Sequence, residues 1–355
     1  MWRSASRAIG AIAGTSALVV LSGCVPEPPS ATSSMQQYLA GSEYLRGVNL
    51  YSLQQQRTLP VTEVKADTQE SYEYFASRGM SVIRLAVPWQ GLQPIAKGET
   101  PRTALARPVD QQYLDLVRKQ VRYAENAGLR VIVDLHNGCT YPWGTGPEPE
   151  GTLYCGGGLT IDDVIKVWGA LSDALRDEPG VAAYNLFNEP RKQTGAATYY
   201  RYVNAVVAEL RDRGDDRAVW VDTILGSSFA SDSQLTAPIS DSAGAVIYSQ
   251  HFYLHGGTRE SLLSRIRDFG EWCKNRAVHC AIGEIGWPAG GSSDKSTTFE
   301  LAYGLADHYG MDVTYFGATS VPNPQSLIAY YATSDDSTVD ARRDQARIVE
   351  KHPTR

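Results

Sequence analysis

Two apolar, strand-like stretches of the sequence each carry a glutamate near the point where the strand gives way to a loop. They are AYNLFNEP at 183–190, with Glu189, and AIGEIGWP at 281–288, with Glu284. Cleavage of a glycosidic bond needs a proton for the leaving oxygen and a nucleophile or activated water at the anomeric carbon. Two carboxyl groups in different protonation states can supply both. We therefore expect the two glutamates to face one cleft, where the charge of one raises the pKa of the other.

The separation of the two carboxyl groups would decide the stereochemistry. Roughly 5 Å implies a covalent intermediate and retention, whereas roughly 6.5 to 9.5 Å leaves room for a water and implies inversion. The two glutamates alone leave both outcomes open. A single glutamate at a strand end is as often a solvated or salt-bridged surface residue, so the hypothesis depends on both meeting at one site.

Short β-branched runs alternate with longer amphipathic ones from residue 45 onward. The connection after the fifth strand is Ser-rich over 227–242 and has the weakest helical pattern. We predict strands at 45–51, 82–87, 131–136, 183–187, 218–223, 246–252, 280–285 and 312–316. We predict helices at 64–78, 110–127, 161–177, 196–212, 259–275, 296–309 and 339–351.

Eight strands that are apolar throughout and alternate with helices indicate a parallel sheet covered by helices. An open doubly wound sheet is the alternative, but it usually has a glycine-rich phosphate loop after its first strand. Here Ser52 and glutamines follow instead. We predict a (β/α)8 TIM barrel in a single domain over 43–355, with polar residues around one mouth at the strand C-termini.

Polar side chains gather at those predicted C-termini. Arg84 either pairs with a buried acid such as Asp134 or contacts the substrate. His136 and His251 would each alone be read as hydrogen-bonded core histidines. A metal site built from them is the alternative, but barrel metallohydrolases generally carry His-x-His on the first strand, and this sequence has none there. We predict no metal and no cofactor.

The composition is that of a globular protein with a large core. The 355 residues are 43% hydrophobic and 20% charged, with net charge −6 and no block of Lys or Arg. Nucleic acid is therefore not an expected partner, and we expect a monomer.

The N-terminus has the pattern of a targeting segment. Arg3 and Arg7 precede an apolar run at 11–21, and LSGC, ending at Cys24, resembles the bacterial lipobox. We predict a lipoprotein signal peptide at 1–23, lipidation of Cys24 and a Pro/Ser-rich tether at 24–42. The protein would then be exported and membrane-anchored on the outer face of the bacterial membrane. A plain secretory signal with an incidental cysteine is the alternative.

Four cysteines remain. Their spacing favours disulfides between Cys139 and Cys155 and between Cys273 and Cys280, although four cysteines allow three connectivities. A zinc site is the rival interpretation, but no CxxC pair occurs.

The motifs RGVNL, IRLAVPW, VDLHN, NLFNEP, QHFY and GEIGWP occur in this order between residues 45 and 316. Together they resemble glycoside hydrolase family 5, the cellulase family of clan A. The resemblance implies a (β/α)8 barrel and a retaining mechanism, with Glu189 as general acid/base and Glu284 as nucleophile. It further implies that Asn188 binds the sugar 2-hydroxyl, that Arg84 and Tyr253 orient Glu284, and that His136 and His251 line the cleavage subsite.

One position departs from the family pattern. The family usually has a Trp at the end of strand eight, stacking under the sugar, and here Phe316 occupies the matching place. Either the smaller ring weakens this platform or Trp287 takes part of the role. Aromatic residues of the loops, Trp89, Tyr141, Trp143 and Tyr154, either stack on sugar rings or pack their loops; we expect Trp89 and Trp143 to contact substrate.

The sequence therefore predicts an exported β-glycan hydrolase, acting on a β-glucan like a cellulase. Hydrolysis of β-mannan, β-1,3-glucan or a glycolipid would use the same catalytic residues. A surface glycan-binding lipoprotein without catalysis is the alternative from another class.

Overall fold

The computed structural model describes residues 33–143, 151–232, 239–254, 257–290, 293–323, 325–332, 339–341 and 343–355. Residues 33–355 form one compact unit. The predicted signal peptide and the predicted lipidation site at Cys24 lie outside the described residues. Within the described part of the chain, no helix is both long enough and apolar enough to cross a membrane.

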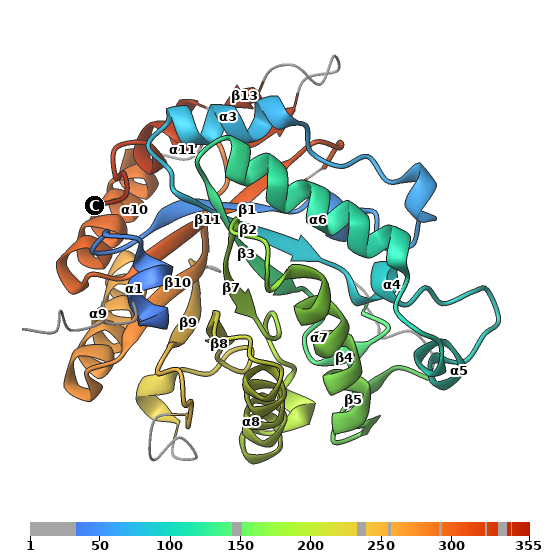
Figure 1. The fold of residues 1–355 in the computed structure, drawn as a ribbon. Coiled ribbons are helices and arrows are strands. Elements are labelled where there is room, and N and C mark those ends of the chain that lie inside the picture. Colours follow the sequence, from blue (N-terminus) through green and yellow to red (C-terminus); the bar gives the residue numbers. More distant parts are fainter. Residues whose placement is uncertain are drawn as a thin grey trace, which may run out of the picture. The chain divides into compact units, whose positions relative to one another are not determined.

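Eight parallel strands close into a barrel (Figure 1). The closure is made by the last strand, which pairs in parallel with the first. The ring runs β1 (Arg46–Leu50), β2 (Val82–Val87), β3 (Arg130–Leu135), β7 (Val181–Asn185), β8 (Ala218–Asp222), β9 (Val246–Tyr253), β10 (His279–Gly286) and β11 (Asp312–Thr319). Almost every residue in them is buried, as expected for strands with the barrel interior on one face and helices on the other. The (β/α)8 prediction is confirmed.

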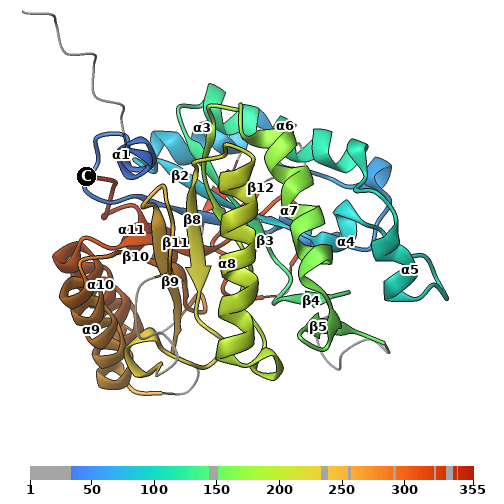
Figure 2. The same cartoon turned by 60° about the horizontal axis from the view of Figure 1, so that its bottom comes forward.

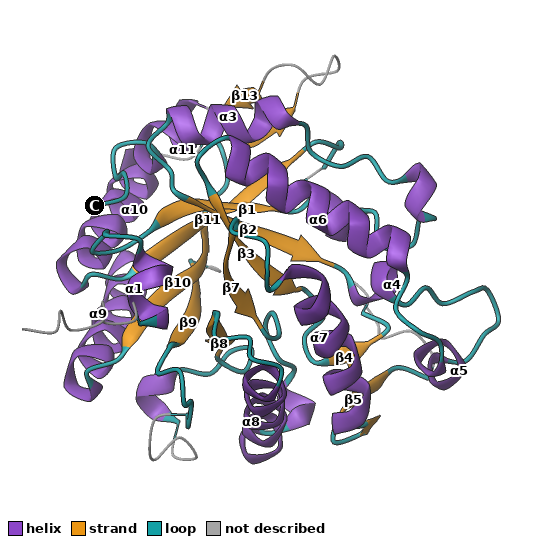
Figure 3. Cartoon of the chain, in the orientation of Figure 1, coloured by secondary structure: helices purple, strands orange, loops and turns teal. Residues whose placement is uncertain are grey.

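The long helices lie outside the ring of strands (Figure 3). Several begin at side chains that cap free backbone N–H groups: Asp110 accepts from Gln112 and Tyr113, and Thr160 forms a capping box with Asp163. The helices are α3 (Gln69–Ser77), α6 (Gln111–Asn126), α7 (Ile161–Leu175), α8 (Ala196–Asp212), α9 (Arg259–Arg276), α10 (Ser293–Tyr309) and α11 (Arg343–Val349).

The Ser-rich connection between β8 and β9 has no long helix among its described residues and contains the 3-10 turn η3 (Phe229–Ser231). This matches the weak helical pattern of the sequence. Short elements occupy other loops: α2 (Ser52–Gln55), η1 (Val61–Glu63), α4 (Trp89–Leu92), α5 (Pro101–Ala106), β4 (Thr140–Tyr141), β5 (Leu153–Cys155), β6 (Gly158–Leu159), η2 (Lys192–Thr194), β12 (Tyr330–Ala332) and β13 (Val339–Ala341).

Both predicted disulfides are present. The disulfide Cys139–Cys155, with a sequence separation of 16, joins the start of the loop after β3 to the end of β5. Cys273–Cys280, with a separation of 7, ties the end of α9 to the start of β10. The first fixes the base of the loop that carries Trp143 at the mouth of the barrel, because closing a loop removes conformational freedom from it.

The structure differs from the predicted tether in one part. Within the range 24–42, residues 34–39 form the helix α1 (Ser34–Leu39), which Ser33 caps in a capping box with Gln36. Tyr38 of this helix is 1% exposed and packs among residues at the starts of the barrel strands, including Val82 and Ile247. The buried Tyr38 closes the N-terminal end of the barrel. Residues 33–42 are therefore part of the folded domain and not of a tether.

Hydrogen bonds hold α1 at that end. The Tyr38 hydroxyl donates to Asp312 Oδ2 at 2.7 Å and accepts from Trp220 Nε1 at 3.1 Å. Figure 2 shows α1 at one end of the barrel and β4 and β5 toward the other. The C-terminal ends of the strands, which carry the polar residues singled out from the sequence, are thus at the end opposite α1.

Candidate active site

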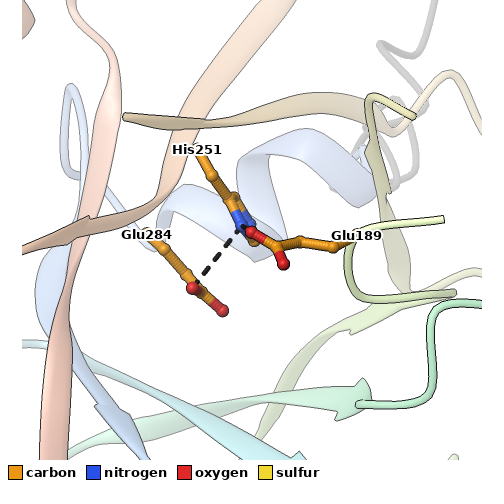
Figure 4. A group of neighbouring side chains, drawn as sticks. All are labelled: Glu189, His251 and Glu284. Carbon is orange, nitrogen blue, oxygen red and sulfur yellow. Dashed lines mark hydrogen bonds and ion pairs between the residues drawn. The ribbon is translucent and has the colours of Figure 1, made fainter. Parts of the chain in front are cut away.

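The two glutamates meet at the mouth of the barrel. Glu284 lies on β10, and Glu189 lies in the loop after β7, with a φ of 44° that non-glycine residues rarely adopt. One carboxylate oxygen of each, together with a ring nitrogen of His251, lie within 4.8 Å of one another (Figure 4). This short separation fits the carboxyl groups of retaining glycosidases. Inverting enzymes hold theirs farther apart, to make room for the attacking water.

Arg84 lies beneath Glu284 and is 0% exposed. Its NH1 donates to Glu284 Oε1 at 2.9 Å and its NH2 donates to Asn188 Oδ1 at 2.7 Å. The same NH2 lies 3.2 Å from Asp134 and 3.5 Å from Asp222. Arg84 was expected among the residues that bind substrate, but it has no surface to offer one. The alternative is confirmed: it pairs with Asp134 and also positions Glu284.

Tyr253 holds the other oxygen of Glu284. Its hydroxyl donates to Oε2 at 2.6 Å. Burial, and then the charge of Glu284, raises the pKa of Tyr253 well above its ordinary value, so the phenol remains a donor at neutral pH. Both oxygens of Glu284 thus accept a hydrogen bond, which fixes the carboxylate in one orientation.

His251 bridges the two glutamates. Its Nδ1 lies 2.9 Å from Glu189 Oε1 and 3.6 Å from Glu284 Oε2, and its Nε2 lies 3.3 Å from Asp222. Burial lowers the pKa of His251, but the charges of Glu284 and Asp222 outweigh it and raise the pKa well above its ordinary value. Burial raises the pKa of Glu189, yet hydrogen bonding and charge from His251 bring it below the ordinary value. In the free enzyme the pair therefore holds its shared proton on His251.

The close approach of His251 depends on Gly283. A Cβ at this position would lie 2.3 Å from Ser249 Oγ and 2.9 Å from His251 Nε2. Any larger residue before Glu284 would displace the Ser249 and His251 side chains at the site.

His136 and Asn188 complete this side of the mouth. His136 Nδ1 lies 2.6 Å from Asp134 Oδ2, so we assign its proton to Nδ1, which leaves Nε2 to accept from Asn188 Nδ2 at 3.3 Å. The two side chains are 4% and 3% exposed. The structure therefore brings together Glu189, Glu284, Asn188, His136, His251 and Tyr253, as predicted.

The predicted aromatic contacts are only partly in place. Phe316 is 6% exposed and meets Tyr51 edge to face at 5.2 Å, and Tyr51 lies 5.4 Å from the His136 ring. The Trp143 ring is 5.9 Å from the His136 ring and is partly exposed. These three rings border the site.

Trp89 and Trp287 lie elsewhere, against expectation. Trp89 is 0% exposed and its Nε1 donates to Gln93 at 2.7 Å, inside the core. Trp287 is 2% exposed and stacks on Phe299 with ring centroids 4.3 Å apart, so its face is already covered. Neither indole presents a face on which a sugar could stack.

Sequence reasoning missed the structural part played by Asp222, which pairs with Arg84 and lies 3.3 Å from His251. Burial raises the pKa of Asp222, but His251 and Arg84 bring it to about 2, so it remains an anion beside them. Asp222 is the last residue of β8, and an acid at the carboxyl end of a buried strand was the signal that could have identified it.

Glu189, His251 and Glu284 are also spaced as metal ligands would be. Their partners favour proton transfer instead. The raised pKa of His251 keeps the imidazole protonated and without a lone pair, and Arg84 and Tyr253 already donate to Glu284.

The pKa order gives a testable pH dependence. The pair of Glu189 and His251 retains a proton to donate until the pH rises through the raised pKa of His251, so kcat/KM should fall on the alkaline side only well above pH 6.5. In His251→Asn the last proton belongs to a carboxylic acid, and the alkaline fall should move to lower pH. Rates measured from pH 4 to 10 check this; an unchanged alkaline limb in the variant would contradict the shared proton.

Two carboxyl groups close together at the mouth of a (β/α)8 barrel are the catalytic arrangement of a glycoside hydrolase. The profile of one family, cellulase (glycosyl hydrolase family 5), matches residues 43–320. The chain belongs to this family and is a glycoside hydrolase.

Solved structures share its fold. An endo-beta-1,4-glucanase from Xanthomonas axonopodis pv. citri is 21% identical over 87% of this chain and 98% of its own, with a TM-score of 0.69. Endoglucanase Cel5A of Pseudomonas stutzeri, determined with cellobiose, is 19% identical over 87% and 92%, with a TM-score of 0.71. Endo-glycoceramidase II from Rhodococcus sp. is 22% identical over 80% and 75%, with a TM-score of 0.62.

Proposed function

We propose that this glycoside hydrolase cleaves a β-1,4-linked glucan with retention of anomeric configuration. The observation that carries the proposal is the position of the two carboxylates, whose oxygens lie within 4.8 Å of one another at the barrel mouth. The family is described as a cellulase, and the endoglucanases of Xanthomonas and Pseudomonas have the same fold.

In the first step Glu284 attacks the anomeric carbon while Glu189 protonates the departing oxygen. The hydrogen bonds from Arg84 and Tyr253 hold the Glu284 carboxylate in one orientation for this attack. Glu189 receives its proton from His251, 2.9 Å away. The bond from the anomeric carbon to the aglycone oxygen breaks as the ester bond to Glu284 forms.

In the second step Glu189 removes a proton from a water that attacks the same carbon. The ester to Glu284 then breaks and the carboxylate is regenerated. Asn188 is held at the edge of the site by Arg84 and His136, which places its amide to bind the sugar 2-hydroxyl. Phe316 with Tyr51 and Trp143 supply the apolar surface near the cleaved sugar.

The N-terminal sequence supports a further part of the proposal. The LSGC motif ending at Cys24 follows an apolar run, as in bacterial lipoproteins. We infer an exported monomer anchored by a lipid at Cys24 on the outer face of the membrane.

A polymer screen with product analysis tests the reaction. We expect reducing ends from β-1,4-glucan, and a β-anomer as the first product by proton NMR. β-Mannan, β-1,3-glucan and a glycolipid are the comparison substrates, because the same catalytic residues would serve them. An α-anomer as the first product would contradict retention, and cleavage confined to another glycan would contradict the β-1,4-glucan assignment.

A further inference from the structure

Two pockets flank the catalytic residues on opposite sides of the barrel mouth. One, of about 280 Å³, lies between the loop after β8 and the end of β9 and is lined by Glu189, His251 and Tyr253. The other, of about 540 Å³, lies between the loops after β1 and β2. In the ring of eight strands β8 and β9 stand four places from β1 and β2, and so diametrically across the mouth.

The second pocket connects to the site through Trp143. Gln90, in its lining, donates to the Trp143 carbonyl at 2.9 Å, and the Trp143 ring lies 5.9 Å from His136. A glycan crossing the mouth between the two glutamates would therefore place sugars in both pockets.

Arg57 lines the second pocket, between the loops after β1 and β2. Its guanidinium lies 5.0 Å over the Trp143 ring, and its hydrogen bond in the described structure is a long one, from NH1 to Gln54 O at 3.4 Å. Its Nε is buried without a partner. No carboxylate of the described residues lies within 4.0 Å of it. Stacking on Trp143 holds the guanidinium plane while most of its N–H donors remain free.

Arg265 lies on the opposite side of the mouth, at the first pocket. It lines the pocket beside Glu189 and donates from NH2 to Tyr253 O at 2.7 Å. Burial lowers its pKa, and no carboxylate of the described residues lies within 4.0 Å to offset this. Lys192 lies near Gly226, one of the residues that line this pocket, because a Cβ built on Gly226 would lie 3.2 Å from Lys192 Nζ.

Many of the described arginines have a carboxylate partner, in a protein whose net charge is −6. Arginines with a carboxylate within 4.0 Å include Arg46, Arg84, Arg102, Arg107, Arg118, Arg122, Arg176, Arg211 and Arg213. Arg107 lines the same pocket as Arg57 but pairs with Glu99. A cation left without a counter-ion at each end of an anionic protein's cleft is placed to bind an anion of the ligand.

Resting on the proposed function, we propose that the natural substrate is an acidic β-glycan, one that carries anionic groups such as carboxylates on its sugars. Arg57 and Arg265 bind these groups on opposite sides of the cleaved bond. A planar guanidinium with free N–H donors can bind a carboxylate through two parallel hydrogen bonds, which a neutral hydroxyl cannot match.

Affinity electrophoresis tests this without requiring turnover. The Glu284→Gln protein would be run through gels containing carboxymethylcellulose or neutral hydroxyethylcellulose, and a dissociation constant obtained for each. We expect tighter binding to the carboxylated polymer. In this background Arg57→Gln and Arg265→Gln should each weaken that binding about three- to tenfold and change hydroxyethylcellulose binding less than about twofold.

Two variants control for the loss of one positive charge. Arg107→Gln removes an arginine that Glu99 already pairs, and Arg267→Gln removes an exposed one on the same helix as Arg265. Neither should alter the preference. Equal binding of the two polymers by the parent protein, or equal losses in the control variants, would overturn the proposal. Failure of the wild-type protein to cleave any glycan would count against the proposed function alone.

Discussion

Replacing Glu284 by Gln is expected to lower kcat on β-1,4-glucan by at least about a thousandfold, because an amide cannot form the glycosyl ester through which retention proceeds. The side chain keeps its shape, so Tyr253 can still donate to the amide oxygen. Arg84 keeps its ion pairs with Asp134 and Asp222. The fold should therefore survive, and the loss should belong to chemistry.

The measurement is release of reducing ends, with thermal unfolding of each variant to confirm folding. Glu73→Gln is the matched control, because it makes the same change on an exposed face of α3. Cleavage of the polymer by Glu284→Gln at near wild-type rate would contradict the nucleophile assignment.

Replacing Glu189 by Ala should give a loss that depends on the leaving group. With β-1,4-glucan, kcat/KM should fall about 10²- to 10⁴-fold, because the departing sugar oxygen then leaves without a proton. With 2,4-dinitrophenyl β-cellobioside, whose phenolate leaves unprotonated, the fall should be less than about tenfold. Added azide should raise kcat in this variant, because azide attacks the glycosyl ester without needing a general base.

The Glu284→Gln protein supplies the comparison for this prediction. Loss of the nucleophile should lower kcat/KM on both substrates alike, and azide should not restore it. If Glu189→Ala lost the same factor on both substrates, the side chain would not be acting as the acid. The two variants together thus distinguish the roles of the two carboxyl groups.

The fold and the central site could be predicted because the apolar strand patterns and the positions of the glutamates both fit a (β/α)8 barrel. Strands buried on both faces read as continuous apolar runs, which is why each predicted strand overlaps an observed one. A (β/α)8 barrel brings the carboxyl ends of all its strands to one mouth, so placing Glu189 and Glu284 near strand ends was enough to predict their meeting. The disulfides followed from short separations of 16 and 7 residues.

The errors concern side-chain direction, which the sequence does not encode locally. Trp89 and Trp287 lie at strand ends as predicted, but both indoles are buried: Trp89 donates to Gln93, and Trp287 stacks on Phe299. Arg84 likewise points into the barrel, because three buried carboxylates surround it there. Composition misled over 33–42, since Tyr38, together with Met35 and Leu39, packs this Ser- and Gln-rich segment against the barrel.

The position of α1 determines which end of the barrel would face the membrane under the proposed lipid anchor. Cys24 precedes Ser33 by nine residues, a span that reaches at most about 30 Å when fully extended. If Cys24 carries the proposed acyl group, this short span keeps α1 within reach of the bilayer, and the catalytic mouth lies at the end of the barrel opposite α1. Long polymers arriving from outside could then thread across the opening without meeting the lipid surface.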